Sequence, residues 1–275
     1  MAKSGGGTLT RTITAFFLIA LTLSFIWIPA LELGFLLYAC ATGGCALYEF
    51  YKFVKAKDPK YHSYLALPLG VAIIASGYWF DINIVNATFA AAALVVAFTH
   101  IIKPNATMST MLPSLFGLGY ISWTAAHFVM LYKIEAMGPV LTTMLIAAVS
   151  LSDTGAYFVG KSIGKHKLAP VVSPNKTWEG SVGGFVFCVA FMATLYFLRE
   201  QKGWGNVPDW SLTRYIIIGA ILSVASQIGD LTESAFKRDA GVKDSGTIFP
   251  GHGGALDRCD GLFVTAPVLY YLTIF

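Results

Sequence analysis

The sequence predicts an all-α integral membrane protein with about nine transmembrane helices and a polar site on the cytoplasmic side of the membrane. Hydrophobic residues make up 56% of the 275 residues and charged residues only 12%, whereas soluble domains carry about 25% charged residues. Several apolar runs reach roughly 20 residues, the length that crosses a bilayer as a helix. Charged residues and glycines concentrate between Ser234 and Asp260, in a chain that is otherwise mostly apolar.

The apolar stretches can be divided into nine spans with approximate edges. In chain order they are Ile13–Ala30, Leu31–Phe53, Tyr64–Phe80, Ile82–Ile102, Met108–Tyr132, Pro139–Val159, Gly180–Leu198, Leu212–Phe236 and Gly261–Phe275. The first lacks a clear small-residue cleavage site and is followed at once by another apolar stretch, so we interpret it as a retained helix. Little more than Asp81 separates the third span from the fourth, which form either a hairpin or a kinked pair. The count is therefore eight to nine, and we prefer nine.

The distribution of basic residues predicts the orientation, because cytoplasmic loops of membrane proteins are enriched in Lys and Arg. With a cytoplasmic N-terminus, nine spans place most of the 19 basic residues inside and leave Lys133, Arg199, Lys202 and Arg214 outside. The C-terminus then lies outside, and the charged segment lies in the cytoplasm. The compact chain favours a bacterial inner membrane, and a net charge of +4 gives no reason to expect nucleic-acid binding.

Carboxylates within or beside the spans are the strongest candidates for chemistry, because ionisable groups in a membrane are costly and usually functional. They are Asp153, Asp230, Glu233, Asp257 and Asp260. Asp230 and Glu233 are three residues apart and share a helix face, as do Asp257 and Asp260 at the start of the last span. Carboxylate oxygens suit Mg²⁺, which also binds substrate phosphates. The alternative is that these acids form interhelical ion pairs with Arg238 and Arg258.

Other residues receive no chemical role. Glu49 lies near a basic interface, and His127 is interpreted as a hydrogen-bonded packing residue. The four cysteines are scattered without a CxxC pair, so we expect buried thiols and neither a disulfide framework nor a zinc site. No internal repeat or soluble domain is visible, and residues 1–275 are interpreted as one polytopic membrane domain with its candidate segments in 150–262.

The turn Pro250–Gly254 is suited to anion binding. Glycines at 251, 253 and 254 allow backbone N–H groups to point into one concavity and phosphate to approach closely. A glycine-rich turn can also be a simple reversal, but its position between Lys243 and Arg258 favours the anion site. His252 could donate to a phosphate oxygen or accept a proton, and the sequence does not choose.

A second polar segment runs from Ser173 to Gly180. Ser173 followed by Pro174 predicts a helix N-cap with proline at the first helical position, which would begin the seventh span. Lys176 would then lie in the first turn of a helix whose N-terminus attracts anions. The alternative is an ordinary cap with Lys176 and Trp178 at the lipid headgroups.

These segments resemble the phosphatidate cytidylyltransferases, also called CDP-diacylglycerol synthases. The resemblance lies in the order Ser234, Lys237-Arg238, Lys243-Asp244, Pro250-Gly-His-Gly-Gly254, Asp257-Arg258 and Asp260. Two further blocks, Asp153–Tyr157 with Gly160 and Ser173–Gly180, are also similar to the family. The resemblance covers the C-terminal half, whereas the N-terminal spans are similar only in hydropathy.

The resemblance implies a reaction in which phosphatidate attacks the α-phosphorus of CTP, giving CDP-diacylglycerol and pyrophosphate. The lipid phosphate is already an anion, so no enzyme nucleophile is required. Catalysis would consist mainly of positioning and charge neutralisation. The implied partners are CTP and phosphatidate in the membrane, and the sequence leaves open the oligomeric state, including a homodimer.

The resemblance also implies roles for the candidate residues. Asp230 and Asp257 are expected to bind Mg²⁺, with Asp260 and Glu233 as further ligands or as groups that hold the ligands. The expected phosphate-binding groups are Lys237, Arg238, Lys243, Arg258, Lys176 in the Ser173 segment and the Gly251–Gly254 turn. Asp153 and Asp244 are expected to orient other groups. The participation of a second, monovalent cation is left open.

Three other functions match only parts of the sequence. A lipid phosphatase could use His252 as nucleophile, but the accompanying Ser-Arg block and downstream His are absent from the sequence. A secondary transporter could use Asp153 and Asp230 as ion sites, but the charges cluster at one cytoplasmic depth. A CDP-alcohol phosphotransferase would need an Asp-Gly-x-x-Ala-Arg block, which the sequence lacks.

Overall fold

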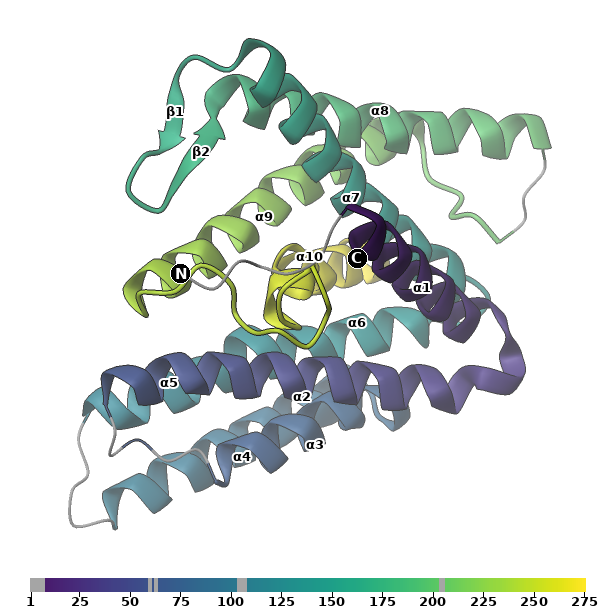
Figure 1. Cartoon of the computed structure of the whole chain (residues 1–275). Helices are drawn as coiled ribbons and strands as arrows, with labels where there is room; N and C mark the ends of the chain where they lie inside the picture. The colour runs from purple at the N-terminus through teal and green to yellow at the C-terminus, as the bar shows by residue number, and fades with distance from the viewer. Residues whose placement is uncertain (1–7, 59–60, 62–63, 103–107, 203–205) are drawn as a thin grey trace. The chain divides into compact units, whose positions relative to one another are not determined.

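The structure is a computed structural model that describes residues 8–58, 61, 64–102, 108–202 and 206–275. Its elements are almost all helical (Figure 1). In order they are α1 (Thr8–Trp27), η1 (Pro29–Leu31), α2 (Glu32–Lys57), α3 (Ala66–Trp79), α4 (Ile82–Ile101), α5 (Met108–Gly117), η2 (Leu118–Trp123), α6 (Thr124–Tyr132), α7 (Gly138–Ile163), β1 (Lys167–Ala169), β2 (Ser173–Thr177), α8 (Trp178–Lys202), α9 (Leu212–Asp239) and α10 (Leu256–Ile274).

The helices support the all-α membrane class. Each apolar stretch identified in the sequence overlaps at least one helix. Among the described residues, 6 helices are long and apolar enough to cross a membrane, and the segments Thr12–Trp27 and Ala66–Trp79 are shorter apolar helices. The count of nine spans stays a prediction.

Asp81 decides the relation between the third and fourth stretches. Its side chain accepts hydrogen bonds from the backbone N–H groups of Asn83 (2.8 Å) and Ile84 (3.1 Å). These donors have no partner within the first turn of α4, so Asp81 acts as its N-cap. The two stretches are therefore separate helices, α3 and α4.

The expected helix start at Ser173 is wrong. Ser173–Thr177 forms β2, which pairs antiparallel with β1. The cap of α8 is Thr177, whose Oγ1 accepts from the N–H of Gly180 (3.1 Å), and Pro174 fits a two-stranded edge because it needs no N–H there. Lys176 therefore lies on a strand and not in the first turn of a helix.

The chain divides into two compact units. Unit 1 consists of Met1–Met130 and Phe236–Cys259, and in it α2 packs against α3, α5 and η2 (Figure 1). Its core includes the fully buried Phe35, Leu47, Ile73 and Leu118. The buried His127 has Nδ1 at 2.8 Å from the carbonyl of Trp123, which confirms its packing role.

Unit 2 consists of Leu131–Ala235 and Asp260–Phe275. Helices α7 and α8 pack along one another (Figure 1). The hydroxyls of Ser152 in α7 and Ser223 in α9 lie 3.0 Å apart, and Ser181 in α8 hydrogen-bonds Gln227 in α9. Small polar side chains are frequent between membrane helices, where they hydrogen-bond across the interface.

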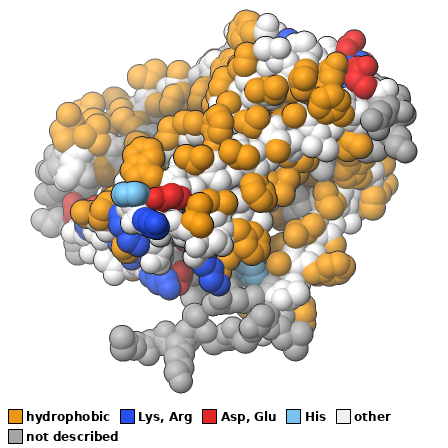
Figure 2. All heavy atoms as spheres, turned by 90° about the horizontal axis from the view of Figure 1, so that it is seen from above, with side chains coloured by type: hydrophobic (Ala, Val, Ile, Leu, Met, Phe, Trp, Pro, Cys, Tyr) orange, Lys and Arg blue, Asp and Glu red, His pale blue; other side chains and the backbone are white. Residues whose placement is uncertain are grey.

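Hydrophobic side chains cover much of the face in Figure 2, and the charged ones gather in small patches. Phe16, Leu94 and Ile101 are each exposed by 70% or more. Such apolar surface is expected where lipid replaces water as the solvent. All four cysteines are free among the described residues, and only Cys188 is buried as expected, whereas Cys40, Cys45 and Cys259 are partly exposed.

Candidate active site

The turn at Pro250 belongs to the loop that joins α9 to α10. The N–H of His252 donates to the carbonyl of Phe249 (2.8 Å), and Gly251 has φ of 76°. Proline at the second position and a positive φ at the third define a type II turn. Gly253 follows with φ of 81°, and its carbonyl accepts from the N–H of Phe249 (3.0 Å). The positive φ angles of this backbone alone therefore favour glycine at positions 251 and 253.

Two backbone N–H groups of this turn already donate hydrogen bonds within the loop and the start of α10. The N–H of His252 donates to the carbonyl of Phe249, and the N–H of Gly254 donates to Asp257 Oδ2 (2.8 Å). The anion-binding role of the Gly251–Gly254 turn therefore stays a prediction that depends on the remaining amides or on a rearrangement. His252 is half-buried, and its Nδ1 has no hydrogen-bond partner among the described residues.

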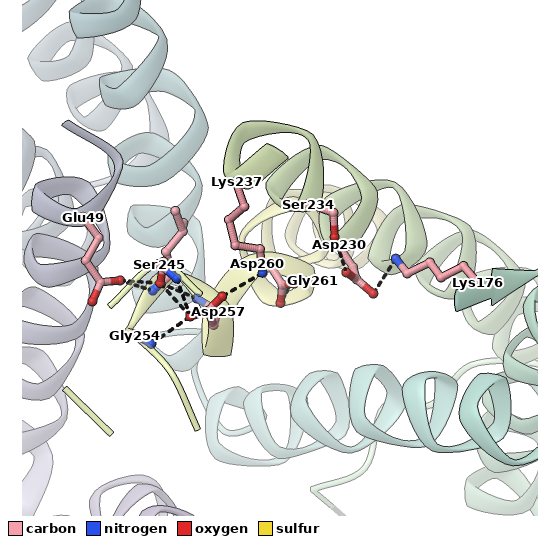
Figure 3. Close-up of polar contacts among 11 residues, drawn as sticks. Glu49, Lys176, Asp230, Ser234, Lys237, Ser245, Gly254, Asp257, Asp260 and Gly261 are labelled. Atoms are coloured by element: carbon pink, nitrogen blue, oxygen red, sulfur yellow. Dashed lines mark hydrogen bonds and ion pairs between the residues drawn. The ribbon is translucent and has the colours of Figure 1, made fainter. Parts of the chain in front are cut away.

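Asp257 is the centre of a polar cluster in unit 1 (Figure 3). Its Oδ1 accepts from Lys237 Nζ at 2.7 Å. Its Oδ2 accepts from the backbone N–H and the hydroxyl of Ser245 and from the N–H of Gly254, each at 2.8 Å. The last contact reaches back three residues from the first turn of α10.

The charge of Asp257 is stabilised by these donors. Burial opposes ionisation of this carboxyl, but Lys237 and the amides of Gly254 and Ser245 outweigh it, so the pKa of Asp257 is lowered. The side chain is only 5% exposed. Asp257 therefore ties the last turn of α9, the loop and the first turn of α10 together as an anion.

Glu49 joins this cluster from α2, and the sequence analysis missed it. Its Oε2 accepts from the Ser245 hydroxyl (2.8 Å) and from the N–H of Leu256 (2.9 Å), and the residue is 2% exposed (Figure 3). The resemblance to a family gave no hint, because its motifs all lie in the C-terminal half. The available signal was an acidic residue inside an apolar span, which is costly without a partner.

Lys176 and Asp230 form the corresponding pair in unit 2 (Figure 3). Lys176 on β2 places Nζ at 2.5 Å from Asp230 Oδ2 on α9. The hydroxyl of Ser234 contacts the other carboxylate oxygen at 3.4 Å. The two side chains are 25% and 34% exposed, so this pair is more open to solvent than that of Lys237 and Asp257.

The remaining candidates are distributed over both units. In unit 1 the exposed residues are Arg238, Lys243, Asp244 and Arg258. In unit 2, Glu233 is fully buried, Asp153 is exposed on α7, and Asp260 Oδ1 accepts from the N–H of Gly261 at 2.8 Å. The ion pairs of Asp230 and Asp257 are made with lysines, where the alternative interpretation expected arginines.

The Mg²⁺ site stays a prediction. No group of three or more His, Cys, Asp or Glu side chains is arranged to hold a metal ion within the described part of the chain. Carboxylate and hydroxyl oxygens of the kind that Mg²⁺ prefers are present at Asp257, Ser245 and Asp230. Each of the two aspartates has a lysine ammonium group beside it, and this group would have to share or leave the carboxylate.

An apolar cavity of about 850 Å³ lies in unit 1. It is lined mainly by side chains of α2, α5 and the end of α9, including Phe50, Val54, Leu112, Phe116 and Phe236. The Lys57–Asp239 ion pair lies at its lining. The cavity is thus apolar with one polar edge, and Phe236 directly precedes Lys237 of the polar cluster.

Comparisons with known proteins agree with the sequence motifs. The model of the "Cytidylyltransferase family" matches residues 9–275. A protein of Staphylococcus aureus (strain COL) named phosphatidate cytidylyltransferase is 35% identical over 274 residues, covering 96% of this chain and 98% of that protein. A protein of the same name from Bacillus subtilis (strain 168) is 36% identical, covering 88% of this chain and 89% of that protein. Another from Brucella suis biovar 1 (strain 1330) is 35% identical, covering 95% of this chain and 91% of that protein.

Proposed function

This chain belongs to the cytidylyltransferase family and is a nucleotidyltransferase, and from that premise we propose that it transfers CMP from CTP to phosphatidate. A phosphate oxygen of phosphatidate attacks the α-phosphorus of CTP, and the bond between the α-phosphorus and its bridging oxygen breaks. The products are CDP-diacylglycerol and pyrophosphate. The names of the relatives support the substrates, and the polar cluster around Asp257 is the observation that carries the proposal, because it brings Lys237, Ser245 and Gly254 of the family-like signature to one carboxylate.

The cations of the site answer the main difficulty of this reaction, which is the repulsion between two anionic substrates. Lys237 and Lys176 each neutralise an aspartate in the structure. We propose that both ammonium groups turn to substrate phosphates on binding, with the exposed Arg238, Lys243 and Arg258 as further phosphate contacts. Positioned cations stabilise the charge that develops on the leaving pyrophosphate.

We further propose that Mg²⁺ takes part, with Asp257 and Asp230 as its expected ligands and Asp260 and Glu233 in support. When bound with the triphosphate, the ion would act as a Lewis acid toward the phosphate oxygens. The oxygen donors present suit this ion. In the structure Asp257 also holds Ser245 and the N–H of Gly254, just before α10.

The lipid side of the proposal is supported by the cavity of about 850 Å³ in unit 1. Its aromatic and aliphatic lining suits an acyl chain, and Lys237 directly follows Phe236, a lining residue. A phosphate held near Lys237 would leave its acyl chain beside this wall of α9. We therefore propose this cavity as the place of one acyl chain of phosphatidate.

The reaction is tested by incubating the purified protein with CTP, phosphatidate and Mg²⁺ and measuring pyrophosphate and liponucleotide. Both products should appear in equal amounts, and omission of either substrate should abolish both. Release of inorganic phosphate from phosphatidate without CTP would indicate a lipid phosphatase and contradict the proposal. Absence of both products from a monodisperse sample would also contradict it, and CTP-independent uptake of an ion into proteoliposomes would then favour a transporter.

We propose that the N-terminus and the signature segment face the cytoplasm, where CTP is available. Single cysteines at Val242 and Asn206, both exposed, test this in a background without the four native cysteines. In sealed right-side-out vesicles, an impermeant maleimide should label Asn206→Cys, and should label Val242→Cys only after permeabilisation. The reverse pattern would overturn the orientation.

A further inference from the structure

We propose that Glu49 is a positioning residue for the nucleotidyl transfer, which holds Ser245 and the start of α10 so that Asp257 and Lys237 are correctly placed. The inference rests on the proposed function and deepens it. Glu49 lies in α2, far in sequence from the signature between Ser234 and Asp260, yet its carboxylate is a direct neighbour of signature residues. It is 2% exposed, so water does not compete for these contacts.

The hydroxyl of Ser245 links the carboxylates of Glu49 and Asp257. The Ser245 hydroxyl lies 2.8 Å from Glu49 Oε2 and 2.8 Å from Asp257 Oδ2. A serine hydroxyl has one hydrogen to donate, so the two carboxylates share it. The same hydroxyl accepts from the N–H of Asp257 at 3.3 Å. A change at Glu49 therefore alters the donor available to Asp257 without touching Asp257 itself.

Glu49 also caps α10 from another helix. Its Oε2 accepts the N–H of Leu256 at 2.9 Å, and Leu256 is the first residue of α10. The first N–H groups of a helix have no partner within the helix, and an acidic group near them is stabilising. Leu256 is fully buried, so loss of Glu49 would leave its N–H without a replacement from water.

The second oxygen of Glu49 fixes the loop by contact. Oε1 has no hydrogen-bond partner among the described residues, and it faces Gly246 and Gly254. A Cβ at Gly246 would overlap Oε1 and would lie 2.9 Å from Glu49 Cδ. A Cβ at Gly254 would overlap both carboxylate oxygens and the Ser245 hydroxyl. The loop can approach Glu49 this closely only because both positions are glycine.

Two substitutions separate positioning from other roles. Glu49→Ala removes the acceptor of Ser245 and Leu256, and kcat/KM should fall roughly 10- to 100-fold because buried donors are left without partners. Glu49→Gln keeps a carbonyl oxygen for both donors and should retain at least about a third of the wild-type activity. Cys45→Ala, one turn earlier on the same helix, is the matched control and should match the wild type.

The kinetic pattern distinguishes displacement of Lys237 from loss of folded protein. In Glu49→Ala the KM of one of the two substrates, the one that Lys237 contacts, should rise roughly 10-fold, while the other KM stays unchanged. A fall in the amount of active protein would lower kcat and leave both KM values as they were. That result, wild-type kinetics in Glu49→Ala, or an equal defect in Glu49→Gln would each overturn the inference.

A double-mutant cycle with Gly246→Ala tests the contact through melting temperature, which needs no activity. Alone, Gly246→Ala should lower the melting temperature because its methyl group meets Glu49. In the Glu49→Ala background the same change should have less effect, since the obstructing carboxylate is gone, and the two effects should not be additive. Additive effects would contradict the placement of Glu49. A wild-type protein that makes no liponucleotide would overturn the proposed function itself. If the wild type is active, but the Glu49 variants keep its activity and the effects of Glu49→Ala and Gly246→Ala on the melting temperature add, only the inference would be overturned.

Discussion

The two aspartate–lysine pairs among the candidate residues, one in each unit, differ in their exposure to solvent. Asp257 in unit 1 is 5% exposed and accepts four hydrogen bonds from Lys237, Ser245 and Gly254. Asp230 in unit 2 is 34% exposed and has Lys176 on one oxygen and a long 3.4 Å contact from Ser234 on the other. The same pairing of residue types thus occurs in two different environments.

The difference in burial and in hydrogen bonding indicates different roles for Asp257 and Asp230. The carboxylate of Asp257 organises a loop and a helix start, so its loss affects both the fold and the chemistry. The carboxylate of Asp230 accepts, besides Lys176 on strand β2, only the long contact from Ser234 among the described contacts. We therefore expect Asp257 to be a structural and functional residue and Asp230 to be mainly functional.

Asp257→Asn should have the largest effect. The amide cannot neutralise Lys237, which is 14% exposed, and breaking a buried ion pair costs about 3 kcal/mol or more of folding stability. Activity should fall by at least about 100-fold because the developing phosphate charge loses its organised surroundings. Turnover and thermal unfolding of the detergent-solubilised variant measure both effects, and a variant that is inactive but as stable as the wild type would contradict the enclosed role.

Asp230→Asn should lose a similar share of activity with little change in stability. The Asp230 side chain is 34% exposed, so the contribution of this pair to folding should be below about 1 kcal/mol. The melting temperature should stay close to that of the wild type while turnover falls by about 100-fold. Equal destabilisation by Asp230→Asn and Asp257→Asn would remove the contrast between the two regions.

Lys176→Ala should have a smaller effect, confined to one substrate. Loss of a charged hydrogen bond to a phosphate costs about 1.5 to 3 kcal/mol, which is roughly a 10- to 100-fold defect. We expect the defect in CTP saturation, because the triphosphate is the more highly charged substrate. A defect seen only in phosphatidate saturation would assign the β2 segment to the lipid.

The pH dependence of stability should give the smallest effect. The folded-state pKa of Asp257 is lowered, so its contribution is complete above the ordinary Asp pKa of about 3.9 and is lost as the pH falls through the folded value. The difference in melting temperature between the wild type and Asp257→Asn should therefore be constant near neutral pH and narrow below about pH 4. A difference that persists unchanged to pH 3 would contradict the ionised state of Asp257.

The helical class could be predicted from the sequence, whereas the contacts among the candidate residues could not. Apolar length identifies helices without knowledge of their neighbours, and the residues of the signature come together because they are close in the chain. The type II turn at Pro250 follows from a local rule. The pairing of Lys176 with Asp230 was not predicted, because it joins a strand to a distant helix.

The failures have physical causes that a single sequence does not display. Ser173-Pro174 satisfies the pattern of a helix start, but Thr177 supplies the same capping oxygen four residues later, and the pairing of β1 with β2 decides between them. Glu49 was passed over because nothing in its local sequence reveals that Ser245 and Leu256, about two hundred residues away, donate to it. Long-range acceptors of this kind require the tertiary structure.

The fate of the CTP phosphates tests the central claim most directly. The purified protein is incubated with phosphatidate, Mg²⁺ and CTP labelled with ³²P at either the α- or the γ-phosphate, and the lipid is extracted. We predict that the α label appears in the lipid fraction and that the γ label appears only in pyrophosphate. Asp257→Asn and Asp230→Asn should each slow the appearance of labelled lipid and of pyrophosphate by about 100-fold or more. Transfer of the γ label to lipid would mean a kinase reaction, and label in neither product would mean no nucleotidyl transfer; either result would contradict the account.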